Sequence, residues 1–361
     1  MFLPLPSRKQ LQISCLVAIG LNILFYILIK SDSQFRIGGA ESGNDSEYYH
    51  AYAIGLVDNA VNIWPVFLRF LNDANLYSRE WISILLFLLH LVFAVVFPRL
   101  AFIGLQSTNL NDKRIKTLRW FFTLLLLLYP TSFLFSLDLY RDLPMLSLVA
   151  IAFVFGFLLI LPGKLLSKLL LFFCFVSLCS LLYAFRPYLG LSVFFALLFY
   201  WKPDRSHIYA MSFSYILALL ALRAAGLLDP ILLYRGFEGF QGGGSSFGIG
   251  LQNVSALAFP FLVGLNILYQ IFGLYFVSPQ ALVVFIVESI PFILAIRFVC
   301  ASRAFMDRPS LYLFYFIIIY SSFVAIGNDN LGTALRLRVY TYVFTGLLSL
   351  RLAALRLHLR L

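Results

Sequence analysis

Residues 327–338, with the sequence GNDNLGTALRLR, separate two apolar runs at 311–326 and 339–350. This alternation of long apolar runs with short polar intervals recurs along the whole chain. The 361 residues are 61% hydrophobic and only 12% charged, and a soluble protein of this size cannot bury that much apolar surface. The sequence therefore predicts an all-α, polytopic membrane protein built as a bundle of transmembrane helices.

Helices of about 20 apolar residues cross a bilayer, and we expect ten or eleven such spans. Residues 259–275 are expected to form a re-entrant or interfacial hairpin on the outer side. The semi-apolar stretch 53–71 is interrupted by polar residues and suits a helix that lies on the membrane. The ten spans are expected at 11–29, 81–105, 120–137, 143–161, a run ending at Phe185, 189–201, 208–228, 285–298, 311–326 and 339–350.

The basic loops predict the orientation. If the N-terminus lies in the cytoplasm, the loops at 111–119, 163–168 and 202–207 face inside, and all three are rich in Lys and Arg. This placement explains the net charge of +11 without a nucleic-acid partner. An eleven-span arrangement with an inverted C-terminal half would leave the C-terminal arginines outside, which the same rule disfavours. We expect a single membrane domain, 1–361, with outer loops at 31–80, 229–255 and 327–338.

Five polar motifs share the predicted outer face. Each lies at the mouth of a span, where helix ends expose unpaired backbone groups. An enzyme that acts on a membrane-anchored substrate would assemble its site there. The three glycines of the fourth motif allow a close backbone approach to a ligand, although a plain flexible connector is the alternative. The motifs are DSEYYH (45–50), DLYRD (138–142), FRPY (185–188), QGGGSS (241–246) and residues 327–338.

Among the Lys and Arg of this face, Arg predominates, and the planar guanidinium suits bidentate binding of phosphate. Four arginines are candidates for binding a pyrophosphate and for stabilising it as a leaving group. The alternative is that each caps a helix, reaches to the lipid headgroups or pairs with a local Asp. The last two candidates point about 200° apart on a helix, so we expect one of them to face the site. The four are Arg141, Arg186, Arg336 and Arg338.

Carboxylates on the same face are candidate bases for a sugar hydroxyl. The candidates are Asp45, Glu47, Asp138 and Asp142. The alternative for Asp142 is that it neutralises the preceding Arg141. Aromatic rings and amides are typical of sugar-binding surfaces, although interfacial anchoring explains tyrosines equally well. The candidate glycan-binding residues are Tyr49, His50, Tyr140, Tyr188, Asn328 and Asn330.

Two polar residues lie within predicted spans. His90 is expected to form an interhelical hydrogen bond. Glu288 could shuttle protons, pair with an outer arginine or be neutral and structural, because an acidic residue inside a span is costly. The four Cys and four His show neither H-x-x-x-H nor C-x-x-C spacing. We therefore expect no metal site and no cofactor.

The order of these motifs resembles the Wzy-type O-antigen or repeat-unit polymerases of bacterial surface-polysaccharide clusters. The resemblance rests on D-S-x-Y-Y-H, Y-R-D, R-P-Y, G-G-S-S, an E-S within a late span and N-x-G-T-A-x-R-x-R. It implies a fold like that of GT-C glycosyltransferases in the bacterial inner membrane, with the active site facing the periplasm. It also implies arginines that hold pyrophosphate, which matches the four candidates above, and no nucleotide sugar.

The resemblance further implies transfer of an undecaprenyl-pyrophosphate-linked glycan onto another lipid-linked repeat unit. Membrane lipid and a chain-length regulator protein are the further partners expected. The large periplasmic loops of some family members are short here, so the first outer loop and the glycine loop would share their role. Two alternatives are a GT-C glycosyltransferase that uses polyprenyl-phosphate sugars, with DSEYYH as its acidic loop, and a transporter or flippase for lipid-linked sugars, which Glu288 favours.

Overall fold

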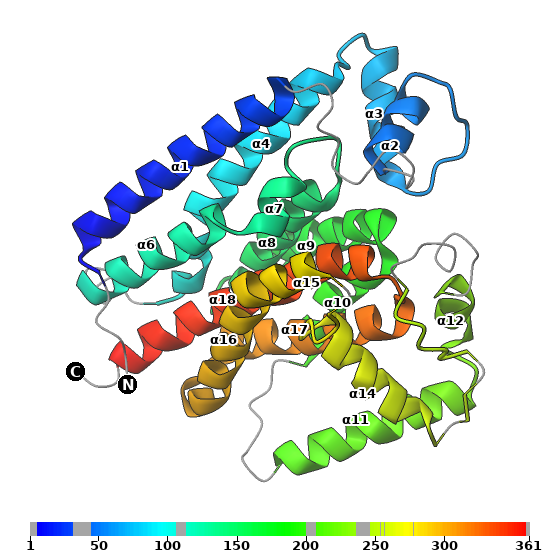
Figure 1. The fold of residues 1–361 in the computed structure, drawn as a ribbon. Coiled ribbons are helices and arrows are strands. Elements are labelled where there is room, and N and C mark those ends of the chain that lie inside the picture. Colours follow the sequence, from blue (N-terminus) through cyan, green and yellow to red (C-terminus); the bar gives the residue numbers. More distant parts are fainter. Residues whose placement is uncertain are drawn as a thin grey trace. The chain divides into compact units, whose positions relative to one another are not determined.

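A computed structural model describes residues 6–31, 45–105, 113–199, 207–235, 246–252, 254–255, 257–276 and 278–358. Helices dominate these residues, which contain no strand beyond an isolated bridge between Ser246 and Asn330 (Figure 1). The all-α prediction is confirmed. The chain forms two compact units, Met1–Phe194 with Gly346–Leu361 (unit 1) and Phe195–Thr345 (unit 2).

Unit 1 contains most of the long helices. Its elements are α1 (Arg8–Ser31), α2 (Asp45–Ala53), α3 (Ile63–Asp73), α4 (Arg79–Val96), the 3-10 helix η1 (Phe97–Phe102), α6 (Lys113–Leu127), α7 (Pro130–Leu134), α8 (Asp142–Ile160), α9 (Leu165–Phe185), most of α10 (Pro187–Leu198) and the end of α18 (Leu331–His358). The expected span 120–137 is divided, because Pro130 cannot continue α6 and instead begins α7.

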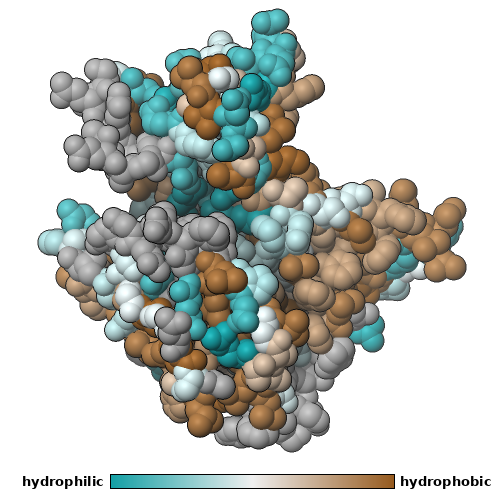
Figure 2. All heavy atoms as spheres, turned by 90° about the vertical axis from the view of Figure 1, so that its right-hand side faces the viewer, coloured by the Kyte–Doolittle hydropathy of each residue, from teal (hydrophilic) through white to brown (hydrophobic). Residues whose placement is uncertain are grey.

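The expected surface helix at 53–71 is shorter and lies further along the chain. Gly55, with a φ of +82°, follows the end of α2, and the Asn62 side chain caps α3 by accepting from the Trp64 N–H. The 11 residues of α3 extend only about 16 Å, too little to cross a membrane. Phe67 and Phe70 of α3 are exposed, and in Figure 2 apolar and polar residues mix on the surface around α2 and α3.

Two hydrogen bonds set the register of the first helix pair in unit 1. The Cys15 thiol lies 3.6 Å from the Trp120 carbonyl, and Asn22 Nδ2 donates to the Leu127 carbonyl at 2.9 Å. The offset between partners is the same in both pairs, so α1 and α6 run parallel. The start of α1 and the start of α6 therefore lie at one end of the unit (Figure 1).

Contacts at the two ends of the α8–α9 hairpin mark the two ends of unit 1. At one end, Arg186 meets Asp142. At the other, Lys168 Nζ donates to the carbonyls of Leu158, at 2.7 Å, and Leu159, at 2.5 Å, which have no partners within the helix. Gly190 lets α10 approach α9, because a Cβ there would lie 2.4 Å from the backbone oxygen of Cys179.

Acidic and basic residues lie toward opposite ends of unit 1. Arg351 of α18 donates from Nη1 to the carbonyls of Ala101 and Ile103, which joins the end of α18 to η1. Every Asp and Glu that the structure describes in unit 1 lies toward the end of α1, the start of α4 and the start of α8. We call the opposite end the basic end. It carries Arg8, Lys9, Arg99, Lys113, Arg114, Lys116, Arg119, Lys164, Lys168, Arg351 and Arg356.

Unit 2 contains α11 (His207–Ala224), α12 (Asp229–Arg235), α14 (Phe259–Gln270), α15 (Pro279–Val284), the π-helical turn η2 (Phe285–Ser289), α16 (Ile290–Ala301), η3 (Arg303–Phe305), α17 (Arg308–Gly327) and the start of α18. Leu232, Phe259 and Ile326 are buried in its core. The expected loop 327–338 is mostly helical, since α18 begins at Leu331. Asn330 caps it, its Oδ1 accepting from the Thr333 N–H at 3.1 Å.

Within the described chain, six helices are long and apolar enough to cross a membrane. These segments are Arg8–Ser31, Arg79–Phe102, Asp142–Ile160, Leu165–Phe185, Pro279–Ala301 and Arg308–Gly327. Three shorter apolar helices are Pro187–Leu198, Ser214–Ala224 and Phe259–Gln270. The protein is accordingly a multi-pass membrane protein.

Candidate functional site

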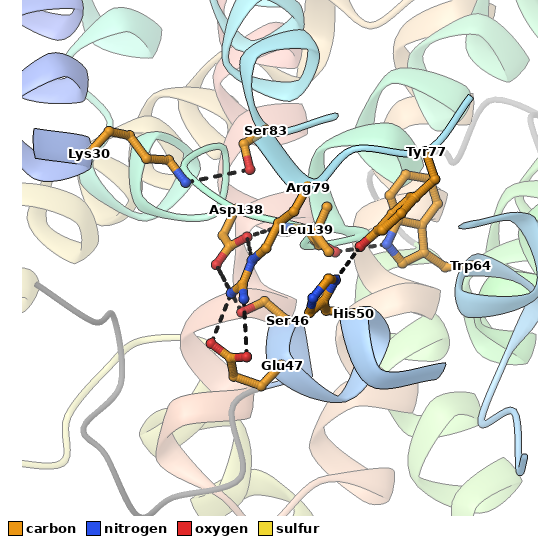
Figure 3. Close-up of polar contacts among 10 residues, drawn as sticks. All are labelled: Lys30, Ser46, Glu47, His50, Trp64, Tyr77, Arg79, Ser83, Asp138 and Leu139. Carbon is orange, nitrogen blue, oxygen red and sulfur yellow. Dashed lines mark hydrogen bonds and ion pairs between the residues drawn. The ribbon is translucent and has the colours of Figure 1, made fainter. Parts of the chain in front are cut away.

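One arginine joins two of the predicted motifs in unit 1. Arg79, at the start of α4, meets Glu47 of α2 through two hydrogen bonds, of 3.1 and 2.9 Å. The same guanidinium meets Asp138 through two more, of 3.1 and 2.7 Å (Figure 3). Such fork-shaped pairing fixes direction as well as distance. We call Arg79, Glu47 and Asp138 the Arg79 bridge.

Both carboxylate oxygens of Asp138 accept hydrogen bonds. Besides Arg79, Asp138 accepts from the Ser46 hydroxyl at 3.1 Å and from the Leu139 N–H at 2.9 Å. Burial raises the pKa of Asp138, but the hydrogen bonds and charge of Arg79, with the charge of Lys30, outweigh burial and hold the pKa below its usual value. Asp138 is therefore ionised, and it ties α2 to the start of α4.

Three further contacts surround the bridge. Lys30 Nζ lies 3.5 Å from the Ser83 hydroxyl, and Trp64 Nε1 donates to the Leu139 carbonyl at 2.8 Å (Figure 3). His50 Nδ1 lies 2.7 Å from the Tyr77 hydroxyl. Burial raises the pKa of Tyr77 to about 12, so Tyr77 remains a neutral phenol that can donate to His50.

The other end of the DLYRD motif forms a second cluster. Asp142 Oδ1 lies 3.6 Å from Arg186 Nη2, and both side chains are only 7% exposed. Arg141 Nη1 donates to the Phe185 carbonyl at 3.1 Å, where α9 ends. Within the described residues Arg141 forms no ion pair, and its buried Nε has no hydrogen-bond partner there. A cation without a carboxylate partner therefore lies beside a buried ion pair.

Unit 2 contains a different buried pair. Arg338 Nη2 lies 3.2 Å from Glu288 Oε2. Glu288 belongs to η2, and π-helical turns inside α-helices are frequent at functional sites. Ser289 contacts the Tyr342 hydroxyl at 2.8 Å, and that hydroxyl donates to the Ile271 carbonyl at 2.8 Å. Of the roles open to Glu288, pairing with an arginine is the one that the structure shows.

A cavity of about 130 Å³ lies beside this pair. Arg338 lines it, whereas the half-buried Arg336 is not among its lining residues. The lining residues are Gly273, Tyr275, Ser278, Gln280, Ala281, Val284, Leu331, Leu335 and Arg338.

Amide hydrogen bonds join the polar interval before α18 to the end of α14. Asn328 Nδ2 donates to Gln270 Oε1 at 2.8 Å, and Gln270 Nε2 donates to the Asn328 carbonyl at 2.7 Å. Ser246, the last residue of QGGGSS, donates to Asp329 Oδ2 at 3.2 Å. The structure therefore brings the end of the fourth motif to the fifth, while residues 241–245 of the fourth lie outside the described chain.

The remaining candidates differ in burial. Tyr49 and Tyr140 are buried at 1% and 4% exposure, and Asn328 is buried too. Asp45, His50, Tyr188 and Asn330 are half-buried. As expected, His90 of α4 forms an interhelical contact, 3.1 Å from the Ser132 hydroxyl of α7. Sequence reasoning did not single out Arg79 and Tyr77, although a charged residue at the mouth of a span was an available signal.

The motifs divide between the units. DSEYYH, DLYRD and FRPY meet in unit 1, and the other two meet in unit 2. Among the described residues, no group of three or more His, Cys, Asp or Glu could hold a metal ion. Comparison of the chain with protein-family models, with curated proteins and with solved structures finds no match.

Proposed function

We propose that this protein is a membrane glycosyltransferase that polymerises undecaprenyl-pyrophosphate-linked oligosaccharide repeat units into a surface polysaccharide. The motif resemblance supplies the chemistry. The observation that supports it is Arg141, a half-buried guanidinium with no ion pair in the described chain, beside the buried Arg186. Holding such a cation near apolar helices is costly unless it meets an anion. A pyrophosphate supplies that anion, with oxygens that match the guanidinium fork.

In this proposal the arginines act on the leaving group. As the bond between the anomeric carbon and the pyrophosphate oxygen breaks, negative charge grows on the pyrophosphate. Arg141 and Arg186 stabilise this charge because they are already oriented before the reaction begins. Asp142 holds Arg186 in place and lowers the repulsion between two neighbouring cations.

The acceptor hydroxyl needs a base. It attacks the anomeric carbon, the new glycosidic bond forms, and its proton passes to a carboxylate. Glu47 is the candidate most open to a substrate, with 46% of its side chain exposed against 17% for Asp138 and 7% for Asp142. Asp45, in the same first turn of α2, is the second choice. Arg79 positions Glu47 and is not itself assigned to the reaction.

The test is deletion of the gene in its host, followed by gel analysis of the surface polysaccharide. Loss of a polymerase leaves single repeat units, and a normal ladder would exclude the proposal. Arg141→Ala should fail to restore the ladder, and Arg141→Lys should restore it only partly, since an ammonium lacks the fork. The matched control is Arg69→Ala, because Arg69 already pairs with Asp58 at 3.4 Å on the surface.

The pair Glu288–Arg338 favours a second candidate function, transport of lipid-linked sugars. Charged residues buried within a span often mark a transport path, and Glu288 lies in the candidate span Pro279–Ala301. The gel separates the functions. Loss of a transporter removes single repeat units from the surface as well as polymer. A GT-C enzyme that uses polyprenyl-phosphate sugars would instead change the composition of the repeat.

A further inference from the structure

Three arginines from three elements converge at the basic end of unit 1. Arg8 begins α1, Arg99 lies in η1 and Arg119 lies in α6. The parallel register of α1 and α6 places their starts together. The rings of Phe97 and Phe122 are 6.3 Å apart and join η1 to α6, three residues after Arg119. The packing of the helices therefore fixes this convergence.

The electrostatics agree with the packing. Burial, followed by the positive charges of Arg99 and Arg8, holds the pKa of Arg119 below its usual value. The three guanidinium groups are thus close enough to repel one another. None of the three forms an ion pair with any residue that the structure describes, and the described Asp and Glu of unit 1 lie toward its other end. Among the residues that the structure describes, the fold collects like charges here without compensating them.

The position of the three arginines at the ends of candidate spans indicates which anion compensates their charges. Arg8 and Arg99 belong to candidate spans, Arg8–Ser31 and Arg79–Phe102, and lie where those spans end. Long basic side chains at span ends reach the depth of the lipid headgroups. The Arg119 guanidinium lies 5.6 Å from the ring centre of Trp120, and tryptophan is typical of this depth. Arg8 and Arg99 are exposed, so their guanidinium groups are open to a ligand.

We propose that Arg8, Arg99 and Arg119 form a binding site for the phosphate headgroup of an anionic phospholipid. The phosphodiester oxygens accept the guanidinium N–H groups, and the acyl chains lie along the apolar faces of α1 and α4. Ile13, Leu16 and Val17 of α1 are exposed and available for this contact. The site is separate from the proposed glycosyl transfer, because the Arg79 bridge lies at the other end of unit 1.

The experiment uses the full-length protein in detergent. Thermal unfolding and native mass spectrometry are followed with phosphatidylglycerol, diphosphatidylglycerol or phosphatidylcholine added. We expect both anionic lipids to raise the unfolding temperature and to remain bound, and phosphatidylcholine to do neither. Inorganic phosphate at equal ionic strength should have no effect. Equal stabilisation by phosphatidylcholine or by inorganic phosphate would overturn the lipid site.

Single substitutions test whether the three arginines form the lipid-binding site. Arg99→Gln and Arg119→Gln should each weaken binding of phosphatidylglycerol about fivefold, equivalent to roughly 1 kcal/mol per cation near an anionic surface. Arg99 is exposed, so its replacement keeps the test valid if Arg119→Gln does not fold. The matched control is Lys164→Gln, an exposed cation of the same end on another hairpin. An equal loss in Lys164→Gln would mean a diffuse surface charge and would overturn the proposal.

Discussion

Arg338 Nη2 lies 3.2 Å from Glu288 Oε2, and the two side chains are only 3% and 0% exposed. They come from α18 and from the π-helical turn before α16, so the ion pair joins two helices inside unit 2. Removing one partner of a buried pair leaves an uncompensated charge, which is more costly than replacing both. The pair therefore holds the start of α18 in place beside the cavity.

The first prediction concerns this pair. Glu288→Gln should lower the free energy of unfolding by about 3–5 kcal/mol, because Arg338 then stays charged without its carboxylate. Glu288→Met combined with Arg338→Met should recover much of that loss. Thermal unfolding in detergent measures both variants. If the double variant were less stable than Glu288→Gln, the pair would not be the reason for the loss.

Gly273 provides a second prediction. Its φ is +70°, and a Cβ there would lie 2.6 Å from Ser289 Oγ and 2.8 Å from Arg338 Nη1. Gly273→Ala should therefore destabilise the protein by about 1–3 kcal/mol through backbone strain and displacement of Arg338. Gly264, in α14, has nothing within 4 Å of a Cβ, so Gly264→Ala is the matched control. It should be neutral or stabilise by about 0.5–1 kcal/mol. Equal effects of the two substitutions would contradict the assignment.

The third prediction is a pH dependence carried by Asp138. The pKa of Asp138 is lower in the folded protein than in the unfolded chain, so its stabilising contribution is present above the ordinary pKa of about 3.9. That contribution is lost as the pH falls toward the folded-state pKa. Between pH 5 and the acid limit of the fold, the unfolding temperature of the native protein should fall more steeply than that of Asp138→Asn. Asp73→Asn, an exposed change in α3, should keep the native slope. Parallel curves for the native protein and Asp138→Asn would refute the prediction.

The fourth prediction separates geometry from charge at the Arg79 bridge. Arg79→Lys keeps the charge but cannot meet Glu47 and Asp138 with paired hydrogen bonds. If Glu47 is the base, its displacement should reduce polymer yield on the order of tenfold to a hundredfold. Gel densitometry at matched protein levels measures the yield. Arg69→Lys, at an exposed pair, should leave the yield unchanged. A normal yield from Arg79→Lys would remove the bridge from the catalytic proposal while leaving the role of Arg141 open.

Local sequence signals account for much of the fold. Apolar runs predicted the helices, and the clustering of Lys and Arg predicted that one end of unit 1 would be basic. Helix ends were harder to place. The expected loop 327–338 becomes helical at Leu331, because Asn330 caps the helix with its side chain. The expected span 120–137 is interrupted at Pro130. In both places a single residue decided where the backbone changes direction.

By itself, the sequence determined that the chain is helical, belongs in a membrane and gathers polar motifs at the ends of apolar helices. These properties depend on neighbours in the chain, which composition and periodicity report directly. Only the tertiary structure decided that Arg79 joins Glu47 to Asp138, and that Asp142 meets Arg186. It also decided that Arg338 pairs with Glu288. Such pairs depend on how each helix is rotated and packed against a distant one, and the local pattern of residues carries no measure of that rotation.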